Sequence, residues 1–503
     1  MKKSILLLIV IGITSLSYGQ GEIDAFRSSR NDLQGTARVQ AMGGAFGALG
    51  GDAGGVVINP AGIGIYRSSE VTATLALSNV KVTTGASDEE SRTKFNFDNL
   101  SYMAYYPVGD NSFNFGFTYN RLKNFDRNYS GSNPNRPTSL TDYMAYRAEG
   151  SYFENMNGSS AYFSRAPWLS ILGWQGFLIN DATDDTYESL LDKGERVDSW
   201  IESSERGRVE AYDFTVGTNI SNNLLLGLTF SLTDIYYQMS STYGEDFQNS
   251  GGFDLDNYLE TTGSGYQLKL GAIYCPIDQL RLGVSYHSPT WYSLRDIYQA
   301  SLLPIGISDD DGYLVPEVRT PNDAYYNYKF RTPYSWTFSL AYIMGTKAIL
   351  SLDYELKDYA GMNLKNNNGY NMVADNDTIQ QHFQMASMIR LGLEYKFTPQ
   401  FSGRLGYARM GNPYTSSIKN EEVQVMTAGT IPQYSIEGDV SMFTAGIGYR
   451  FTPQFYIDAA FVCRTQTDDF YYYSPMPGFG LTSQSVSSEN KTFRGLVTLG
   501  YKF

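Results

Sequence analysis

Cysteine and histidine are scarce in this sequence. Only two cysteines, Cys275 and Cys463, occur in 503 residues, which excludes a disulfide framework. We expect two buried thiols, with a single bridge between them as the alternative. The histidines are His287, predicted to face a lumen, and His382, predicted to begin a strand. Two isolated histidines cannot form a convincing metal site or a Ser-His-acid triad, so the sequence predicts no enzyme, no metal and no cofactor.

Long hydrophobic runs are also missing after the N-terminus. Lys2 and Lys3 precede the apolar run 5–13, and the small residues of Ser17-Tyr18-Gly19 follow it, which is typical of a secretory signal peptide over residues 1–19. The run is shorter than the roughly 20 residues that a membrane-spanning helix needs. No later segment is comparable, which excludes a helical membrane protein. The net charge of −14 argues against nucleic acid as a partner.

Aromatic residues and glycine are abundant. The chain has 41 Tyr, 28 Phe and 49 Gly, with a mean hydropathy of −0.31. Apolar side chains alternate with polar ones, as in the segment 389–397, where Ile389, Leu391 and Leu393 share one face and Arg390 and Glu394 the other. This period of two indicates strands with one apolar face. The composition therefore favours many amphipathic strands.

The alternation predicts about fourteen strands, an even number as single-chain outer-membrane barrels require. We expect them near 70–83, 95–107, 112–128, 208–221, 223–241, 260–275, 279–291, 328–344, 346–361, 381–397, 400–416, 436–451, 454–469 and 490–503. The predicted fold class is an all-β transmembrane antiparallel barrel over residues 70–503.

Short and long connections between these segments alternate strictly. Short turns occur at PVGDN, SNN, CPIDQ, MGTK and two FTPQ sites. Long polar loops are expected near 84–94, 129–207, 242–259, 292–327, 362–380, 417–435 and 470–489, with the longest, 129–207, as an extracellular insertion. Short periplasmic turns and long outer loops are typical of a transmembrane barrel, whose closure also leaves no unpaired strand edge.

Strand parity sorts the charged residues. It places the following side chains inside the barrel: Arg281, Arg390, Lys396, Arg404, Arg450, Asp458 and Arg494. The last strand ends at Phe503 after alternating apolar residues, which resembles the signal read by the barrel-insertion machinery. We therefore expect outer-membrane lipid and that machinery as partners during biogenesis.

Residues 20–69 precede the first strand and include the glycine-rich stretch Gly50–Tyr66, too glycine-rich for a helix. A barrel of this size would leak unless its lumen is filled. Glycine lets backbones approach closely, so we expect residues 20–69 to form a hatch inside the lumen. The inward glycines expected to receive it are Gly392, Gly406, Gly446 and Gly448.

The segment GTARVQAMGGAFGALGGDAGGVVINPAGI resembles the hatch of the FadL/TodX (OmpP1) family, in which a glycine-rich stretch leads to an Asn-Pro-Ala motif, here Asn59-Pro60-Ala61. LRLGVSYHSP, TPYSWTFSLAY and the strands around the two FTPQ turns are also similar to that family. The resemblance covers the hatch and most strands from residue 280 onward, and is weak across 129–207.

The resemblance implies passive uptake of hydrophobic molecules, such as long-chain fatty acids, across the cell outer membrane. Outer loops would capture the ligand, a luminal pocket would hold it, and a lateral opening in the wall would release it into the bilayer. Fatty acids, aromatic hydrocarbons and sterol-like ligands all suit an apolar pocket. The alternative is a structural role, as the outer-membrane barrel partner of a protein secretion system.

Three groups of residues are candidates for this function. Asn59, Pro60 and Ala61 form either a gate hinge or a static turn that anchors the hatch. Arg281, Arg390 and Arg450 either contact a ligand headgroup or only pair with Glu394, Asp458 and water. In the outer loop, ligand capture or loop packing is expected of Trp168, Leu172, Trp174 and Phe177.

Overall fold

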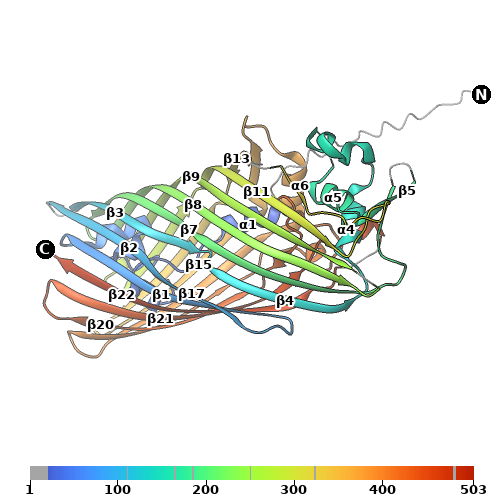
Figure 1. Ribbon diagram of the computed structural model, residues 1–503. Helices are drawn as coiled ribbons and strands as arrows, with labels where there is room; N and C mark the ends of the chain where they lie inside the picture. Colours follow the sequence, from blue (N-terminus) through green and yellow to red (C-terminus); the bar gives the residue numbers. More distant parts are fainter. Residues whose placement is uncertain are drawn as a thin grey trace, which may run out of the picture.

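The computed structural model describes residues 21–503 except 110, 164–165, 184–185, 250, 322–324 and 480–482. The expected signal peptide, residues 1–19, lies outside the described residues. The chain forms a closed antiparallel barrel of 14 strands around its N-terminal segment (Figure 1). No described helix is both long and apolar enough to cross a membrane.

All fourteen predicted strand segments contain a strand of the barrel. In order around the wall these are β1 (Glu70–Thr84), β2 (Glu90–Val108), β3 (Asn111–Asn124), β7 (Val197–Ile220), β8 (Leu224–Phe247), β9 (Gly252–Ile277), β10 (Leu280–His287), β14 (Ser335–Met344), β15 (Ala348–Asp358), β17 (Met385–Lys396), β18 (Phe401–Met410), β20 (Val440–Arg450), β21 (Phe455–Tyr471) and β22 (Val486–Lys502). Pairing of β1 with both β2 and β22 closes the barrel.

Shorter strands continue the wall above these. They are β4 (Arg127–Arg136) beside β7, β11 (Trp291–Ile305) beside β9, β12 (Val318–Arg319) and β13 (Tyr325–Arg331) beside β11, β16 (Asn363–Asn366) beside β13, and β19 (Tyr434–Ile436) beside β21. A separate hairpin joins β5 (Ile179–Thr183) to β6 (Thr186–Ser189).

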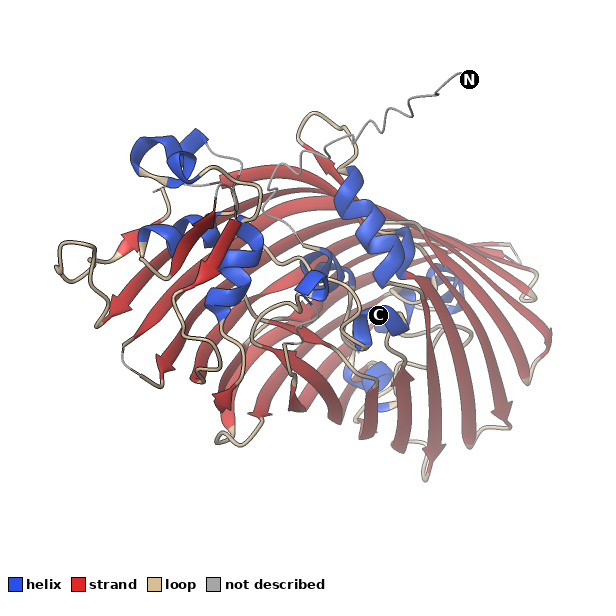
Figure 2. Ribbon diagram, turned by 90° about the vertical axis from the view of Figure 1, so that its right-hand side faces the viewer, coloured by secondary structure: helices blue, strands red, loops and turns tan. Residues whose placement is uncertain are grey.

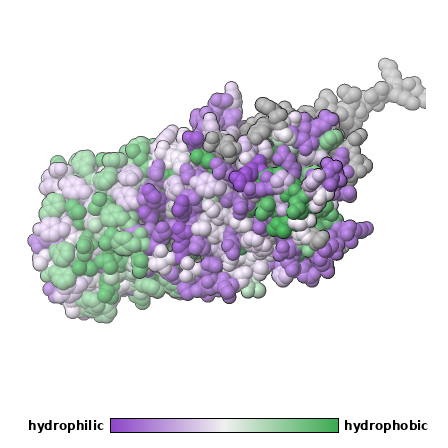
Figure 3. Space-filling view, viewed as in Figure 1, coloured by the Kyte–Doolittle hydropathy of each residue, from purple (hydrophilic) through white to green (hydrophobic). Residues whose placement is uncertain are grey.

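An apolar band surrounds the end of the barrel that carries the short turns and the C-terminus (Figure 3). Its outward side chains include Phe214, Leu228, Leu391, Ile447 and Leu499, all more than a third exposed. Such a band is costly in water and fits lipid, so the short turns face the periplasm. The outward parity predicted from the sequence is confirmed.

Several expected loops are strands instead. The segments 84–94 and 242–259 were expected to be long loops, but β1 and β2 are joined at 85–89 and β8 and β9 at 248–251. Above the apolar band the outward residues of β8 become polar, as at Asp234, Ser240 and Asp246, while the strand continues. The apolar alternation therefore ends before the hydrogen-bonded ladder does.

The segment 129–207 is likewise not one loop. It begins in β4, ends in β7 and contains α4 (Leu140–Ala148) and α5 (Trp168–Gln175). The described residues of 137–196, which we call the cap, lie at the outer end of the barrel, where Figure 1 labels α4, α5 and β5 and Figure 2 looks onto the helices and loops of that end. A separate hydrophobic core joins the cap to the upper ends of β7–β9 and to residues 470–476, and includes Ile171, Leu172, Tyr243, Phe253 and Tyr472.

The N-terminal segment fills the lumen, as the hatch prediction requires. It contains α1 (Glu22–Ser29), α2 (Ala37–Ala41), α3 (Ala53–Val56) and the 3-10 helix η1 (Pro60–Ile65). The expectation that Gly50–Tyr66 forms no helix was wrong. Side chains cap both short helices, because Asp52 accepts from the Gly54 N–H at 3.0 Å and Asn59 from the Ala61 N–H at 3.1 Å.

His382 also lies elsewhere than expected. It is the last residue of α6 (Val373–His382), a helix above the barrel, and not the first residue of a strand. Its Nδ1 lies 3.0 Å from Glu22 Oε1 of α1. Both cysteines are free, on strands β9 and β21, so the alternative of a bridge between them is excluded. They are only partly buried, so the expectation of two buried thiols was wrong in that respect.

Candidate functional site

Three of the predicted glycines receive the N-terminal segment. A Cβ added at Gly406 would lie 2.1 Å from the backbone N of Gly43. One added at Gly392 would lie 2.7 Å from Met42 O, and one added at Gly446 would lie 2.5 Å from the Ala41 Cβ. Any larger residue would push α2 and its following turn off the wall. Gly448 was also expected to contact the hatch, but it lies against Arg404 and Asp458.

A second group of glycines, not singled out in the sequence, receives the Asn-Pro-Ala motif on the other wall. Gly227 pairs with Gly217 on β7 and with Gly271 on β9. An added Cβ would lie 2.2 Å from Pro60 C at Gly227, 1.9 Å from Asn59 Oδ1 at Gly271 and 2.4 Å from Ile63 Cγ2 at Gly217. A row of glycines on adjacent strands would have predicted this contact with the hatch. The sequence does not show the row, because the pairing register decides which glycines lie side by side.

Asn59 is fully buried and uses both ends of its amide. Its Nδ2 donates to Gly47 O at 2.6 Å and, more weakly, to Ala272 O at 3.3 Å and Val284 O at 3.4 Å. Its Oδ1 accepts from Ala61 N. This geometry ties two turns of the hatch to β9 and β10, as an anchor requires; whether the motif also acts as a hinge stays a prediction.

Ion pairs hold the lower part of the hatch. Arg38 of α2 lies 2.8 Å from Glu394, and Arg404 lies 2.7 Å from Glu394 and 2.6 Å from Asp458. Glu394 and Asp458, expected as partners of Arg281, Arg390 and Arg450, thus pair with Arg38 and Arg404. His287 likewise serves the hatch, since its Nε2 lies 3.0 Å from Ile58 O.

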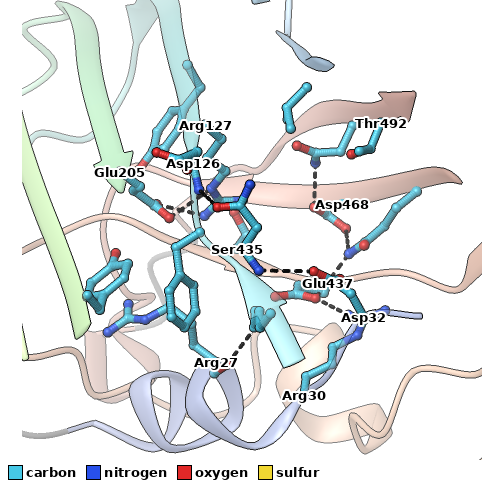
Figure 4. A pocket seen from close by; sticks show the side chains of 18 of the residues that line it. Arg27, Arg30, Asp32, Asp126, Arg127, Glu205, Ser435, Glu437, Asp468 and Thr492 are labelled. Carbon is cyan, nitrogen blue, oxygen red and sulfur yellow. Dashed lines mark hydrogen bonds and ion pairs between the residues drawn. The ribbon is translucent and has the colours of Figure 1, made fainter. Parts of the chain in front are cut away.

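A cavity of about 170 Å³ lies between α1 and the wall (Figure 4). Its lining is more polar than the apolar pocket expected from the resemblance. Charged side chains line it from α1, from the residues that follow α1, and from strands and their connections: Asp24, Arg27, Arg30, Asp32, Arg121, Lys123, Asp126, Arg127, Glu205, Glu437, Arg464, Asp468 and Arg494. Apolar patches between them include Phe125, Ile431 and Phe470. The cavity therefore suits a molecule with both polar and apolar parts.

Most of these charges have an ion-pair partner. Arg127 Nη2 of β4 lies 2.8 Å from Glu205 Oε1 of the neighbouring strand β7, and Arg30 pairs with Glu437 (Figure 4). Arg30 is nonetheless buried with its Nη2 lacking a hydrogen-bond partner among the described residues. An incoming polar group could satisfy that donor.

None of the predicted headgroup arginines lines this cavity. Arg281 donates to Leu49 O of the hatch, and Arg390 pairs with Glu355 in a second cavity of about 120 Å³. Arg450 is exposed at the periplasmic mouth, in a third cavity of about 130 Å³. Arg494, which strand parity placed inside the barrel, does line the first cavity, but it was not singled out as a headgroup contact, because parity identifies an inward residue and not its height in the lumen. The other arginines of the lining, Arg27, Arg30, Arg121, Arg127 and Arg464, were missed.

The wall beside the first cavity is interrupted. β2 pairs with β3 from Val108↔Asn111 up to Asn99↔Asn120 and no further. Above that point β2 keeps only β1 as a hydrogen-bonded neighbour, while β3 and β4 keep only β7. We call this interruption, between Glu90–Asp98 on one side and Arg121–Arg136 on the other, the seam; the structure describes all of its residues.

Side chains bridge the seam in place of the backbone. Arg121 Nη1 donates to Asn96 Oδ1 at 2.6 Å, and Arg92 Nη1 donates to Asn128 Oδ1 at 3.0 Å. Arg92 also lies 3.4 Å from Asp126. Asn96, Arg121 and Asp126 line the first cavity as well, so the cavity reaches the seam from inside.

The lower end of the seam lies at the level of the apolar band. On β2 the outward residue Phe95 is 67% exposed, and its neighbour Leu77 on β1 is 54% exposed. Phe97 stacks on Tyr119 across the foot of the seam at 5.8 Å between ring centroids. A molecule leaving through the seam would therefore meet apolar side chains and lipid.

The predicted capture residues belong to the core of the cap. Leu172 is fully buried there, and Trp168, Trp174 and Phe177 pack against that core while partly exposed. Trp174 Nε1 donates to Asn157 Oδ1 at 2.9 Å. This arrangement agrees with the packing alternative, and a capture role for the three exposed residues stays a prediction.

A family model of outer membrane transport proteins, described as OMPP1/FadL/TodX, matches residues 215–470. The chain belongs to the OMPP1/FadL/TodX family. Its members are outer-membrane transporters of hydrophobic compounds and not enzymes. Among the described residues, no three His, Cys, Asp or Glu side chains are grouped so as to hold a metal ion.

Solved structures share the fold of this FadL/TodX family member. A Pseudomonas aeruginosa FadL homologue has a TM-score of 0.56 at 12% identity, covering 94% of this chain and 99% of its own. A deletion mutant of the TodX monoaromatic hydrocarbon channel has a TM-score of 0.51 at 13% identity, and the match covers 94% of this chain and 100% of the channel's chain. The Pseudomonas putida toluene transporter TodX has a TM-score of 0.48 at 14% identity, and the match covers 94% of this chain and 99% of the transporter's chain. No curated protein sequence matches.

Proposed function

We propose that this protein takes up hydrophobic molecules passively, through the outer mouth of the barrel, into the first cavity and then sideways through the seam into the bilayer. The observation that carries this proposal is that the β2–β3 ladder ends at Asn99↔Asn120, so the wall directly beside the cavity lacks backbone pairing between these strands. The hatch blocks the direct route to the periplasm, because its backbone lies against glycines on opposite walls. The seam is therefore the route that requires the smallest movement.

The sideways route needs no energy source. Each buried CH₂ group of a ligand contributes about 0.8 kcal/mol, so a hydrophobic molecule gains by moving from a cavity of mixed lining into lipid. Opening the seam breaks side-chain hydrogen bonds and ion pairs that water can replace, whereas opening an intact strand pair would break a backbone ladder.

The ligand class follows from the cavity and the family. The mixed lining favours a molecule with an apolar body and a polar end, such as a long-chain fatty acid, while the TodX relatives are named for toluene and monoaromatic hydrocarbons. Arg30 and Arg127 are the best placed headgroup contacts. Arg281, Arg390 and Arg450 would contact a ligand only on a path past the hatch, so uptake tests of these three arginines separate the two routes.

The proposal includes the hatch motif as the part that responds to ligand. Asn59, Pro60 and Ala61 hold η1 against β8 and β9, so a small displacement there would loosen the hatch as a unit. The description of the family as transport proteins and of TodX as a channel favours this transport role over the alternative of a secretion partner.

Cross-linking the seam tests the route. In a Cys275→Ser/Cys463→Ser background, Asn96→Cys and Arg121→Cys replace two side chains in contact across the seam. Closing that pair with a reducible bifunctional thiol reagent should reduce uptake of labelled oleate and toluene to the level of cells lacking the protein. Reduction should restore uptake.

The matched control joins an intact strand pair. Thr215 and Thr229 lie side by side on β7 and β8, with 2.7 Å between their Oγ1 atoms. Cross-linking Thr215→Cys to Thr229→Cys should leave uptake unchanged. Full uptake through a quantitatively cross-linked seam would contradict the lateral route.

A further inference from the structure

Four exposed cations lie together on the outward face of the wall, where the wall extends beyond the apolar band. They are Arg295 on β11, Lys329 and Arg331 on β13, and Lys365 on β16. Strands β9, β11 and β13 are hydrogen-bonded neighbours there (Figure 1), and β16 continues the wall beside β13. We call these four residues the basic patch. The chain as a whole has a net charge of −14, so the patch is a local concentration of the opposite sign.

No residue of the basic patch forms an ion pair within the part of the chain that the structure describes. Arg331 donates to Gly361 O at 3.3 Å, a neutral acceptor. Arg295 lies 4.6 Å from the centroid of the Tyr325 ring. These contacts orient the two guanidinium groups and leave their charge uncompensated.

Exposed cations elsewhere on the barrel do have a carboxylate partner. The pairs are Lys81 with Glu89, Arg319 with Glu317, Arg409 with Asp439, and Lys491 with Glu489. Two outward carboxylates on β9 and β15, Glu260 and Asp358, form no ion pair with the basic patch. The patch therefore offers its positive charge to an external anion.

Two of these cations face each other across a strand pair. Lys329 and Lys365 are directly opposite in the β13–β16 register. Like charges in this arrangement destabilise a strand pair. Strand β16 has only four residues, and β13 is the one strand beside it among the described residues. An anion bound between the two lysines would remove the repulsion and hold β16 to the wall.

The basic patch begins at the upper edge of the apolar band. Arg331 is directly opposite Trp291, whose ring stacks on Tyr266 at 5.3 Å between centroids. On β10 and β14 the rings of Tyr286 and Trp336 lie 4.8 Å apart. Such a girdle of amphipathic rings is typical of the level at which lipid headgroups begin. The other three cations follow within about 14 Å along the strands, so the patch lies beside the headgroups.

A lipid phosphate matches the basic patch in charge and in position. A phosphate ester carries a charge of about −1.5 to −2 and three acceptor oxygens, so one group can contact both opposed lysines. The guanidinium of Arg331 below them suits the same group, because its planar donors match phosphate oxygens. The acyl chains of that lipid would lie on the apolar band, a contact that a free anion in water cannot make.

We propose that the basic patch binds the phosphate group of an outer-leaflet lipid, with the phosphate between Lys329 and Lys365 and the acyl chains on the apolar band. The chemical class is a phosphorylated glycolipid of the lipid A type. The bound lipid holds β16 at the outer rim. This inference goes beyond the proposed uptake and is independent of it, because the patch lies on β11, β13 and β16 and the seam lies between β2 and β3.

The first test measures lipid binding to the purified protein by native mass spectrometry in mild detergent. Lys329→Gln/Lys365→Gln should bind lipid A at least about tenfold more weakly than the wild type, because two cations at the headgroup level are lost. Lys329→Arg/Lys365→Arg keeps the charges and should keep the affinity. Dephosphorylated lipid A should bind the wild type as weakly as lipid A binds the glutamine variant, and equally tight binding of the two lipids would overturn the proposal.

The matched control removes the same charge from paired cations. Arg409→Gln/Lys491→Gln replaces two exposed cations that each have a carboxylate partner, and it should leave the affinity for lipid A unchanged. Equal losses in the two glutamine variants would reduce the effect to overall charge, and the proposal would fail. Displacement of lipid A by inorganic phosphate at equal concentration would assign the patch to free phosphate and overturn the lipid site.

The second test uses the wild-type protein, so it does not depend on a variant folding. Hydrogen–deuterium exchange of the peptide spanning Asn363–Asn366 should become slower when lipid A is added, and dephosphorylated lipid A should have no such effect. Unchanged exchange with lipid A would contradict the stabilisation of β16. Both tests measure lipid binding in purified protein, whereas the seam test measures uptake, so either proposal can fail while the other stands.

Discussion

One amide side chain, that of Asn59, joins two turns of the hatch to two strands of the wall. Replacing it with alanine removes both the donor and the acceptor. We expect Asn59→Ala to assemble but to take up hydrophobic compounds more slowly. The measurement is uptake at equal surface abundance, and an unchanged rate would exclude a gating role for the motif.

Asn59→Asp sharpens this test. An aspartate keeps the acceptor for Ala61 N but places a carboxylate oxygen against the carbonyls of Gly47, Ala272 and Val284. An unpaired buried charge is costly, so Asn59→Asp should loosen the hatch more than Asn59→Ala. Cells carrying it should become more sensitive to large antibiotics that the closed barrel excludes.

The pH dependence of α6 has a residue-level origin in Asp375. Burial raises the pKa of Asp375 from 3.8 to about 6. Between these values the folded state binds more protons than the unfolded one, so the stabilisation of α6 is complete below the lower value and lost as the pH rises through the higher one. Hydrogen exchange of α6, corrected for intrinsic rates, should become faster from about pH 4 to about pH 7.

Two asparagine variants check this assignment. Asp375→Asn should remove the pH dependence, because no proton is then taken up on folding at that position. Asp377 is an exposed neighbour on the same helix, and Asp377→Asn should retain the dependence. A pH dependence that survives in Asp375→Asn would assign it to another group.

At the scale of elements, glycines decide whether helix and strand can meet. A Cβ at Gly227 would lie 2.2 Å from Pro60 C and 2.4 Å from Ala61 N, both backbone atoms that cannot turn aside. We expect Gly227→Ala to form the barrel but to displace η1, which single-channel conductance would register as a leak. The backbone of Gly227 is not in the left-handed region, so its conformation does not require glycine. Glycine is required because the backbone of the hatch lies so close.

Gly495 is the matched control. It lies on the outward face of β22, and an added Cβ would have no neighbour within 4 Å among the described residues. Gly495→Ala should keep the conductance of the wild type. A leak in both variants would trace the defect to strand propensity and not to the contact with the hatch.

Element positions also show what the sequence could and could not predict. The apolar alternation predicted every barrel strand, yet the upper ends of β7, β8 and β9 were missed because their outward residues are polar there. The position of the seam could not be predicted from the sequence. It depends on where two strands stop pairing, and not on the composition of β2 or β3.

At the scale of the whole molecule, two independent sources of stability act. Backbone ladders close the barrel, whereas the cap depends on its hydrophobic core. Leu172→Ala should destabilise the cap by about 2–5 kcal/mol, the usual cost of a large-to-small change in a core. Limited proteolysis should cleave the cap earlier, while the heat-modifiable mobility of the barrel on gels stays unchanged.

Replacing Trp174 distinguishes a packing role in the cap from a role in ligand capture. It is partly exposed on the core of the cap, so Trp174→Ala should destabilise the cap less than Leu172→Ala. If uptake nevertheless falls at normal cap stability, the capture role predicted for Trp168, Trp174 and Phe177 gains support. Normal uptake in all three alanine variants would leave them as packing residues.

The sequence by itself determined the class, the strand number, the filled lumen and the family resemblance of this protein. These follow from local rules: a strand in lipid must alternate every second residue, and a glycine-rich motif keeps its pattern in the chain. The tertiary structure decided which arginines meet in the cavity, which glycines receive the Asn-Pro-Ala motif and where β2 parts from β3. These depend on strand register and height in the lumen, which join residues hundreds of positions apart.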